Sequence, residues 1–191
     1  MRRRLIRPAG EPCVPLGYHT GHPTHARKPT MIFKTSDLCD QFAESKRLQI
    51  AEPLLRSFGG HTAFSGRITT LKVFEDPVKI RETLGEKSEN GVLVVDGGGS
   101  HRCALLGADL AKLACDHGWQ GIIVYGCIRD SVEIGRLPLG VRALHTHPLR
   151  SHKRGTGERD ILITFAGVNF RTGHYLYADE DGIVVADDPL V

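Results

Sequence analysis

The sequence predicts an α/β fold in which layers pack on a central mixed sheet. Two apolar runs near the middle of the chain, residues 91–96 and 121–128, are typical of buried strands, and residues 101–118 between them have the apolar spacing of a helix. The segments on both sides of this β-α-β unit are short and β-branched or alternating. A β-α-β centre with β-rich flanks indicates a layered α/β domain with a mixed sheet.

Two further helices are predicted ahead of the centre. Thr35 or Ser36 can cap the first, which runs through residues 37–46. Pro77 can begin the second, over residues 77–87, because its fixed φ suits the first helical turn.

Glycines mark the expected irregularities and ends. Gly66 is a candidate bulge within a strand over residues 63–76, residues 97–100 form a turn, and Gly118 ends the helix over 101–118. Four more strands separated by Gly and Asp turns are expected over residues 139–146, 161–170, 174–179 and 182–187.

Length, charge and cysteine usage exclude several classes of protein. A chain of 191 residues is long enough for one domain with its own core. The net charge is only +3, so no broad basic field indicates a nucleic-acid partner. No apolar run approaches the roughly 18–20 residues that span a membrane. Five cysteines without a C-x-x-C pair indicate reduced, packed thiols and a cytoplasmic location.

Residues 1–30 differ from the rest and are expected to be disordered or loosely structured. They are rich in Pro and Arg, contain one acidic residue, Glu11, and show no strand or helix periodicity. Such a start permits a mitochondrial presequence. A misassigned start codon is an equal alternative, because Met31 opens a segment typical of an ordinary N-terminus. The folded domain is therefore expected to comprise residues 31–191.

The strand over residues 121–128 ends at Arg129 and Asp130, and Glu133 follows three residues later. An Asp and a Glu at this spacing resemble a capping box, which needs no chemistry. The same spacing can turn both carboxylates towards one hard cation, and a neighbouring guanidinium suits a carboxylate substrate. The residues alone leave both interpretations open.

Other candidate motifs have simpler explanations. Gly97 and Gly99 fit part of a dinucleotide-binding fingerprint, but Arg102 occupies its third glycine position, so a tight turn is the better interpretation. The histidines, including His145 and His147 on one strand face, lack zinc-ligand spacing and are predicted to be surface or interface residues.

Four segments together resemble the RraA-like family, which includes 4-hydroxy-4-methyl-2-oxoglutarate aldolases and the regulator of ribonuclease activity A. The segments are EPLLRSFGGHTAFSGRITTLKVFED, VLVVDGGGSHRCALLGADLAKLA, GWQGIIVYGCIRD and YLYADEDGIVV. The resemblance covers residues 31–191. It implies a swivelling β/β/α-type layered domain and assembly into a homotrimer or a dimer of trimers.

The resemblance also implies a chemistry and a site. The aldolases use a divalent metal, Mg²⁺ or Mn²⁺, to cleave 4-hydroxy-4-methyl-2-oxoglutarate into two pyruvates and to decarboxylate oxaloacetate through a metal-stabilised enolate. The family's metal carboxylate falls on Asp130, its substrate arginine on Arg129, and an acid that accompanies activity on Glu133. Its substrate-binding stretch falls on Gly107, Ala108, Asp109 and Leu110.

Regulatory members of the family are the alternative. They bind and inhibit a ribonuclease of the E type, or act on its helicase partner, without the aldolase acids. The stretch RDSVE, residues 129–133, is similar to the aldolase branch. The expected partner is therefore a small 2-oxo acid, with a ribonuclease only under the alternative.

Overall fold

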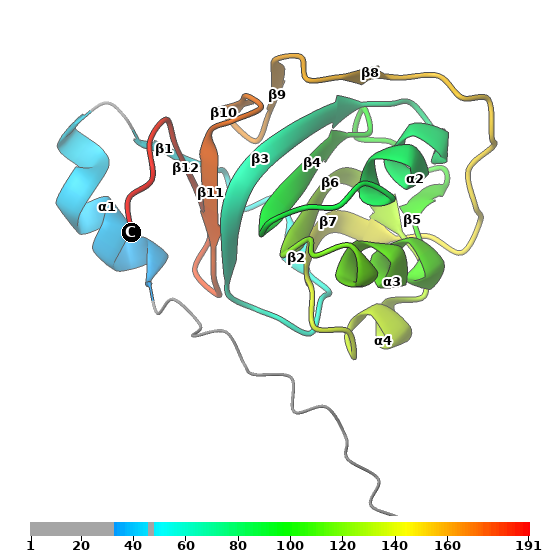
Figure 1. The fold of residues 1–191 in the computed structure, drawn as a ribbon, viewed down its shortest axis with the longest axis horizontal. Helices are drawn as coiled ribbons and strands as arrows, with labels where there is room; N and C mark the ends of the chain where they lie inside the picture. The colour runs from blue at the N-terminus through cyan, green and yellow to red at the C-terminus, as the bar shows by residue number, and fades with distance from the viewer. Residues whose placement is uncertain (1–32, 46–47) are drawn as a thin grey trace, which may run out of the picture. The chain divides into compact units, whose positions relative to one another are not determined.

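The structure, a computed structural model, describes residues 33–45 and 48–191. A large mixed sheet runs in the order β1–β12–β11–β3–β4–β6–β7–β2 (Figure 1). Its parallel centre consists of β3 (Phe64–Lys72), β4 (Gly91–Asp96), β6 (Gly121–Ile128) and β7 (Gly140–Thr146). Its antiparallel flanks consist of β1 (Leu48–Ile50), β2 (Arg56–Ser57), β11 (Tyr175–Ala178) and β12 (Ile183–Ala186). The predicted mixed sheet is confirmed.

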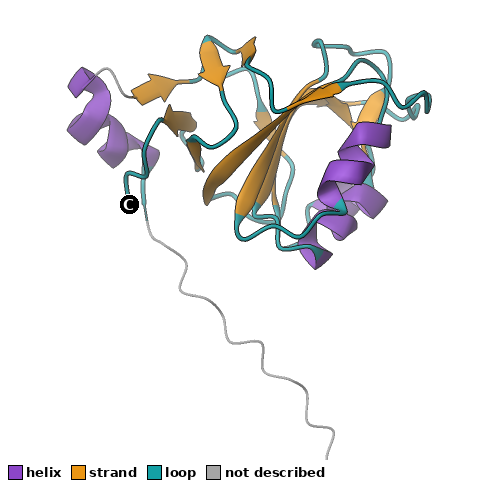
Figure 2. Ribbon diagram, turned by 45° about the horizontal axis from the view of Figure 1, so that its top comes forward, coloured by secondary structure: helices purple, strands orange, loops and turns teal. Residues whose placement is uncertain are grey.

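Helices cover one face of this sheet (Figure 2). They are α2 (Val78–Leu84), α3 (Ala108–Asp116) and α4 (Ser131–Ile134). Leu93 and Val95 of β4 belong to the apolar cluster on the helical side, and Val92 and Val94 belong to the cluster on the other side. Because side chains alternate along a strand, β4 is buried on both faces, which explains its unbroken apolar sequence. The layered α/β prediction is therefore confirmed.

The opposite face is covered by a hairpin of β9 (Ile163–Phe165) and β10 (Val168–Phe170). A single strand was predicted over residues 161–170, and this is wrong. Ala166 and Gly167 both have positive φ, 51° and 70°, so they form the turn that reverses the chain.

The helix predicted over residues 101–118 is also wrong in its first half. Ala104–Leu106 form a short strand, β5, which pairs in parallel with β6, and α3 begins only after Gly107. All three residues of β5 are buried. A short apolar run of this kind does not reveal by its periodicity whether it is a strand or a helix. Gly118 does adopt the left-handed conformation, at φ +83°, just beyond the end of α3.

Two local predictions, the bulge at Gly66 and the cap of the first helix, fail because of contacts with residues distant in the sequence. Gly66 pairs in regular register with Leu176, so it forms no bulge; a Cβ there would lie 2.1 Å from the carbonyl oxygen of Asn90. Neither Thr35 nor Ser36 caps α1 (Thr35–Phe42), whose N-cap position is Lys34. The backbone N–H and the hydroxyl of Thr35 instead both donate to the carboxylate of Asp179, each at 2.6 Å.

Asp179 joins α1 to the turn between β11 and β12. Its carboxylate also accepts hydrogen bonds from the backbone N–H groups of Asp181 and Gly182, and only 5% of the residue is exposed. Burial by itself would raise the pKa of Asp179, but the hydrogen bonds from Thr35, Asp181 and Gly182 outweigh it and lower that pKa.

Asp179 is therefore expected to make the free energy of unfolding fall as the pH becomes acidic. A carboxylate with a lowered folded-state pKa stabilises the fold above its unfolded pKa of about 3.9, and this contribution is lost as the pH falls through the folded value. Asp179→Asn should lower the free energy of unfolding by about 1–3 kcal/mol at pH 7. The difference from wild type should shrink below about pH 4. Urea unfolding at several pH values measures this, with Asp181→Asn in the same turn as the matched control; equal losses in both variants would contradict it.

The other predicted elements are present with small changes of boundary. Pro77 occupies the N-cap position of α2, and residues 97–100 form the expected turn. Short strands β1, β2 and β8 (Glu158–Arg159) were not predicted, and the end of the first predicted helix is a 3-10 turn over Ala43–Ser45. Within the described residues, no helix is long and apolar enough to cross a membrane. The expectations for residues 1–30 lie outside the described part of the chain.

Candidate functional site

Strand β6 places Arg129 and Asp130 at its carboxyl end, against the start of α3. The backbone N–H of Arg129 donates to the carbonyl of Leu106 at 2.9 Å, which extends the pairing of β5 with β6 by one residue. Asp130 then adopts a left-handed conformation, with φ 58° and ψ 38°, and α4 begins at the next residue. Asp is among the residues that tolerate this conformation best.

The carboxylate of Asp130 does not cap α4. Asp130 occupies the N-cap position, and its carbonyl accepts from the N–H groups of Glu133 and Ile134, but its side chain makes no capping hydrogen bond. Oδ2 of Asp130 instead accepts from the backbone N–H of Ala108 at 3.2 Å and lies 3.4 Å from Nε of Arg129. Both contacts use Oδ2, so Oδ1 stays available to a ligand.

Gly107 allows this close approach between α3 and the end of β6. A Cβ at this position would lie 2.9 Å from Oδ2 of Asp130 and 3.1 Å from Nε of Arg129. Both atoms belong to side chains that are 38% exposed and can shift. A side chain at residue 107 would therefore displace the Arg129–Asp130 pair.

The other residues of the predicted substrate-binding stretch are Ala108, Asp109 and Leu110, and only Ala108 contacts Asp130. Ala108 contributes its backbone N–H to the Asp130 carboxylate, whereas its side chain is buried. Asp109 is exposed in the first turn of α3, and the Leu110 side chain packs in the core on the helical side of the sheet. The structure thus brings Gly107 and Ala108 to Arg129 and Asp130, and Leu110 holds α3 in place.

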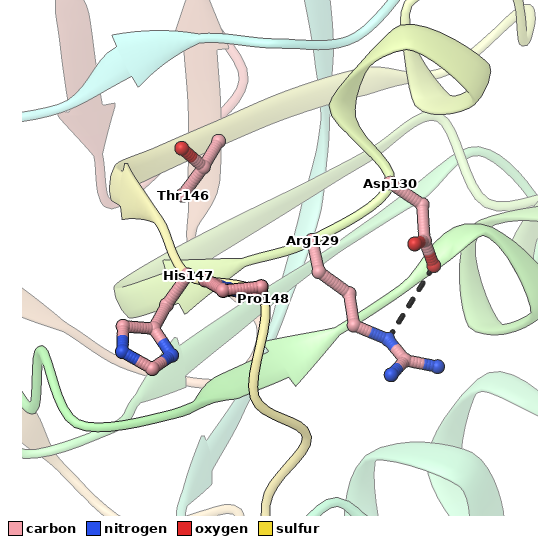
Figure 3. Close-up of a pocket in the computed structure, with 5 residues that line it drawn as sticks. All are labelled: Arg129, Asp130, Thr146, His147 and Pro148. Atoms are coloured by element: carbon pink, nitrogen blue, oxygen red, sulfur yellow. Dashed lines mark ion pairs between the residues drawn. The ribbon is translucent and has the colours of Figure 1, made fainter.

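A pocket of about 290 Å³ opens beside Arg129 and Asp130 (Figure 3). Its other lining residues are Thr146, His147 and Pro148, which end β7 and begin the following loop. Residue 128 of β6 is paired with Thr146 of β7, so the pocket lies across the carboxyl ends of two neighbouring parallel strands. Ligand sites of α/β sheets commonly lie at such strand ends.

The histidines were predicted to be surface or interface residues, and one of them, His147, lies at the pocket. This residue is half-buried and lines the pocket. His145 is exposed, and its ring meets that of His101 edge to face, with 5.1 Å between centroids. The sequence showed only that His147 follows a predicted strand. That it lies near Arg129 follows from the register between β6 and β7, which the sequence did not reveal.

Glu133 lies on α4 and is not among the residues that line the pocket. Its Oε2 is 3.7 Å from Nζ of Lys112 on α3, and both side chains are more than half exposed. An exposed pair at this distance contributes little to stability.

Asp76 fixes the loop that leaves the pocket. Its buried carboxylate accepts from the backbone N–H groups of Arg154 at 3.0 Å and Thr156 at 2.8 Å, and from that of Val78 at the start of α2. Burial alone would raise the pKa of Asp76, but these hydrogen bonds outweigh it and lower the pKa. The carboxylate therefore stays ionised and connects the loop to α2.

The glycine turn has a purely structural explanation. A Cβ on Gly97 would lie 2.4 Å from the Leu105 side chain and 2.7 Å from the carbonyl oxygen of Tyr125, and Gly98 and Gly99 both have φ +66°. The side chain of Asp96 accepts from the N–H of Gly98 at 2.9 Å and occupies the turn itself. Tight packing and positive φ therefore account for all three glycines.

Three of the cysteines that the structure describes are packed and not arranged for nucleophilic attack. Cys103 and Cys127 are buried and Cys115 is half-buried, and all three are free thiols. Burial raises the pKa of each of these thiols, which keeps them protonated and weakly nucleophilic.

The residues around Asp130 fit a hard divalent cation that keeps most of its waters. Mg²⁺ is commonly held by one or two carboxylates, water and substrate oxygens, so Oδ1 of Asp130 can supply the protein ligand. No group of three His, Cys, Asp or Glu side chains that could enclose a metal occurs among residues 33–45 and 48–191. An all-protein cage of the zinc type therefore does not fit the described site.

Comparison with known proteins identifies the family of the chain. The family model RraA-like, described as Aldolase/RraA, matches residues 35–185. The chain belongs to the RraA-like family. A relative from Methylococcus capsulatus, named "Putative 4-hydroxy-4-methyl-2-oxoglutarate aldolase", is 69% identical over 161 residues, which cover 84% of this chain and all of the relative.

Two solved structures share the RraA-like fold closely. One, described as an S-adenosylmethionine: 2-dimethylmenaquinone methyltransferase from Geobacillus kaustophilus, has a TM-score of 0.80 and 52% identity over 83% of this chain and 97% of its own. The other, the RNA-processing inhibitor RraA from Thermus thermophilis, also has a TM-score of 0.80, with 42% identity over 84% of this chain and 96% of its own. The aldolase names of the high-identity relatives support a lyase.

Proposed function

We propose that this protein is a divalent-metal-dependent aldolase that cleaves 4-hydroxy-4-methyl-2-oxoglutarate into two pyruvates and also decarboxylates oxaloacetate. The observation that carries the proposal is the pairing of Arg129 with Asp130 at the mouth of the pocket, with the Asp130 carboxylate turned away from α4. The aldolase names of relatives that are 69% and 62% identical support the same reaction.

Both reactions pass through the same kind of anion. Aldol cleavage removes the proton of the 4-hydroxyl and breaks the C3–C4 bond, which gives pyruvate and the enolate of a second pyruvate. Oxaloacetate gives the same enolate by losing carbon dioxide. In each case C3 of the enolate then takes a proton from water. The site must therefore bind a 2-oxo acid and tolerate negative charge on its 2-oxo oxygen.

The chain's own residues suit these tasks. The guanidinium of Arg129 can bind the substrate carboxylate with two parallel hydrogen bonds. Asp130 would hold the metal through Oδ1 while Ala108 and Arg129 fix its orientation. A bound Mg²⁺ or Mn²⁺ would supply a Lewis acid for the developing charge. Gly107 lets the start of α3 lie close to the Arg129–Asp130 pair.

Glu133 would orient water from the edge of the site. If its charge matters, Glu133→Gln should stay folded while metal-dependent turnover falls about 10–100-fold, which is typical for residues that support a metal ligand. Loss of the exposed pair with Lys112 by itself should change little. Titration of Mg²⁺ or Mn²⁺ against pyruvate release measures this, with Lys112→Gln as the matched control. Superimposable curves for wild type and Glu133→Gln would show that Glu133 has no role in metal-dependent turnover.

The proposed active form is a homotrimer or a dimer of trimers. Val132 and Leu149 lie next to pocket residues in the sequence and are 70% and 59% exposed. Exposed apolar side chains that form a contiguous patch can mark a surface that a partner covers. Sedimentation at several protein concentrations tests this assembly, and a monomer at all of them would contradict it.

The second candidate function is regulation of an RNA-degrading enzyme. It is favoured by the RNA-processing inhibitor from Thermus thermophilis, which shares 42% identity with this chain. The discriminating experiment measures pyruvate release from both substrates after dialysis against a chelator, and again with Mg²⁺ or Mn²⁺ restored. Release that requires the restored metal supports the aldolase. Absence of release, together with inhibition of a ribonuclease of the E type, supports the regulator.

A further inference from the structure

We propose that His147 is a substrate-binding residue whose Nε2–H donates a hydrogen bond to the carboxylate held by Arg129. The inference rests on the proposed function, because it assigns a residue to the same 2-oxo acid site. It concerns a side chain that lines the pocket and that the metal chemistry does not use.

The register of the sheet places His147 next to Arg129. Ile128 of β6 pairs with Thr146 of β7, and the backbone N–H of His147 completes this pairing by donating to the carbonyl of Ile128 at 2.8 Å. Arg129 and His147 are the residues that directly follow this pair on the two strands. Side chains at paired positions of parallel strands extend to the same face. In Figure 3 both side chains extend below Thr146, the His147 ring to the left and the Arg129 guanidinium to the right, towards Asp130.

The hydrogen bonding of the His147 ring determines which of its nitrogens can donate to a ligand. The backbone N–H of Leu149 donates to Nδ1 of His147 at 3.2 Å. A nitrogen that accepts a hydrogen bond carries no proton, so the neutral ring carries its proton on Nε2. His147 is therefore a hydrogen-bond donor through Nε2 and is not set up to act as a general base.

The backbone holds this donor in position before any ligand binds. Pro148 restricts the residue that precedes it to extended conformations. The hydrogen bonds to Ile128 and from Leu149 fix both the backbone and the ring of His147. A donor that is already oriented loses little conformational entropy on binding, so its hydrogen bond contributes more to affinity.

The ligand class follows from this pair of donors. Arg129 and the neutral His147 ring offer N–H groups from adjacent strand ends, which suits an acceptor with two oxygens and a negative charge. A carboxylate fits, and it is present in the substrate and in both products. His147 should therefore contribute equally to ground-state and transition-state binding, which affects KM rather than kcat.

The test compares His147→Ala and His147→Gln with His145→Ala, the matched control on the same strand face. His147→Ala should raise KM for oxaloacetate, and the inhibition constant for pyruvate, by about 10–100-fold, the value of a hydrogen bond to a charged group. Turnover at saturation should hardly change. His147→Gln should restore most of the affinity because its amide keeps a donor, and His145→Ala should match wild type.

Imidazole ¹⁵N NMR supplies a readout that does not depend on turnover. The free protein should show the Nε2–H form of His147, and pyruvate should shift its Nε2 signal while that of His145 stays unchanged. If wild type releases no pyruvate, the proposed function fails, and this titration alone tests His147. An unchanged KM in His147→Ala, or an unchanged His147 signal at saturating pyruvate, would overturn the inference.

Discussion

Replacing Asp130 by asparagine is expected to abolish pyruvate release without unfolding the protein. The asparagine oxygen can still accept the hydrogen bond from Ala108, so the local structure is kept. Because the Asp130 side chain does not cap α4, the cost to stability should stay below the roughly 1 kcal/mol of a lost cap. Removing the charge takes away the proposed metal ligand and the chemistry that depends on it.

The measurement pairs pyruvate release with thermal unfolding of the same samples. Asp116→Asn removes an exposed carboxylate at the far end of α3 and is the matched control, expected to keep both rate and stability. If Asp130→Asn unfolds easily while the folded fraction remains fully active, the carboxylate has only a structural role.

Replacing Arg129 by lysine should have the second largest effect. Lysine keeps the positive charge but cannot form two parallel hydrogen bonds to a carboxylate. It also has no counterpart of the Nε that lies 3.4 Å from Asp130. We expect kcat/KM to fall by about 10–100-fold, as for the loss of a charge-assisted hydrogen bond, with the metal still bound.

Two measurements on Arg129→Lys separate loss of substrate binding from loss of the metal. Steady-state kinetics report the first, and Mn²⁺ binding reports the second. The matched control is Arg159→Lys. Arg159 pairs with Glu86 at 2.6 Å and does not line the pocket, so this variant should behave as wild type. Wild-type kinetics for Arg129→Lys would remove Arg129 from the proposed substrate site.

The sequence predicted the centre of the fold because that part of the sheet is buried on both faces. The strands over 91–96 and 121–128 were correct, since their apolar runs have few alternative interpretations. Residues 104–106 were assigned to a helix because three buried residues carry no periodicity of their own. The cap of α1 was missed because Asp179 lies 144 residues away in the sequence.

Part of the candidate site was predicted through the resemblance to the RraA-like family, which assigned Arg129, Asp130, Gly107 and Ala108. Arg129, Asp130, Gly107 and Ala108 meet as expected, because a strand end and a helix start lie next to each other in a β-α-β unit. His147 depends on the register between β6 and β7, which no local pattern specifies. The direction of the Asp130 carboxylate likewise depends on α3. The roles of Arg129, Asp130 and Glu133 in catalysis stay proposals.

The most direct test of the central claim is a crystal structure of the protein with Mn²⁺ and pyruvate, using the anomalous signal of manganese. The proposed function predicts an anomalous peak within bonding distance of Oδ1 of Asp130 and the pyruvate carboxylate on the Arg129 guanidinium. A manganese peak away from Asp130, or pyruvate bound outside the pocket next to β6 and β7, would contradict it.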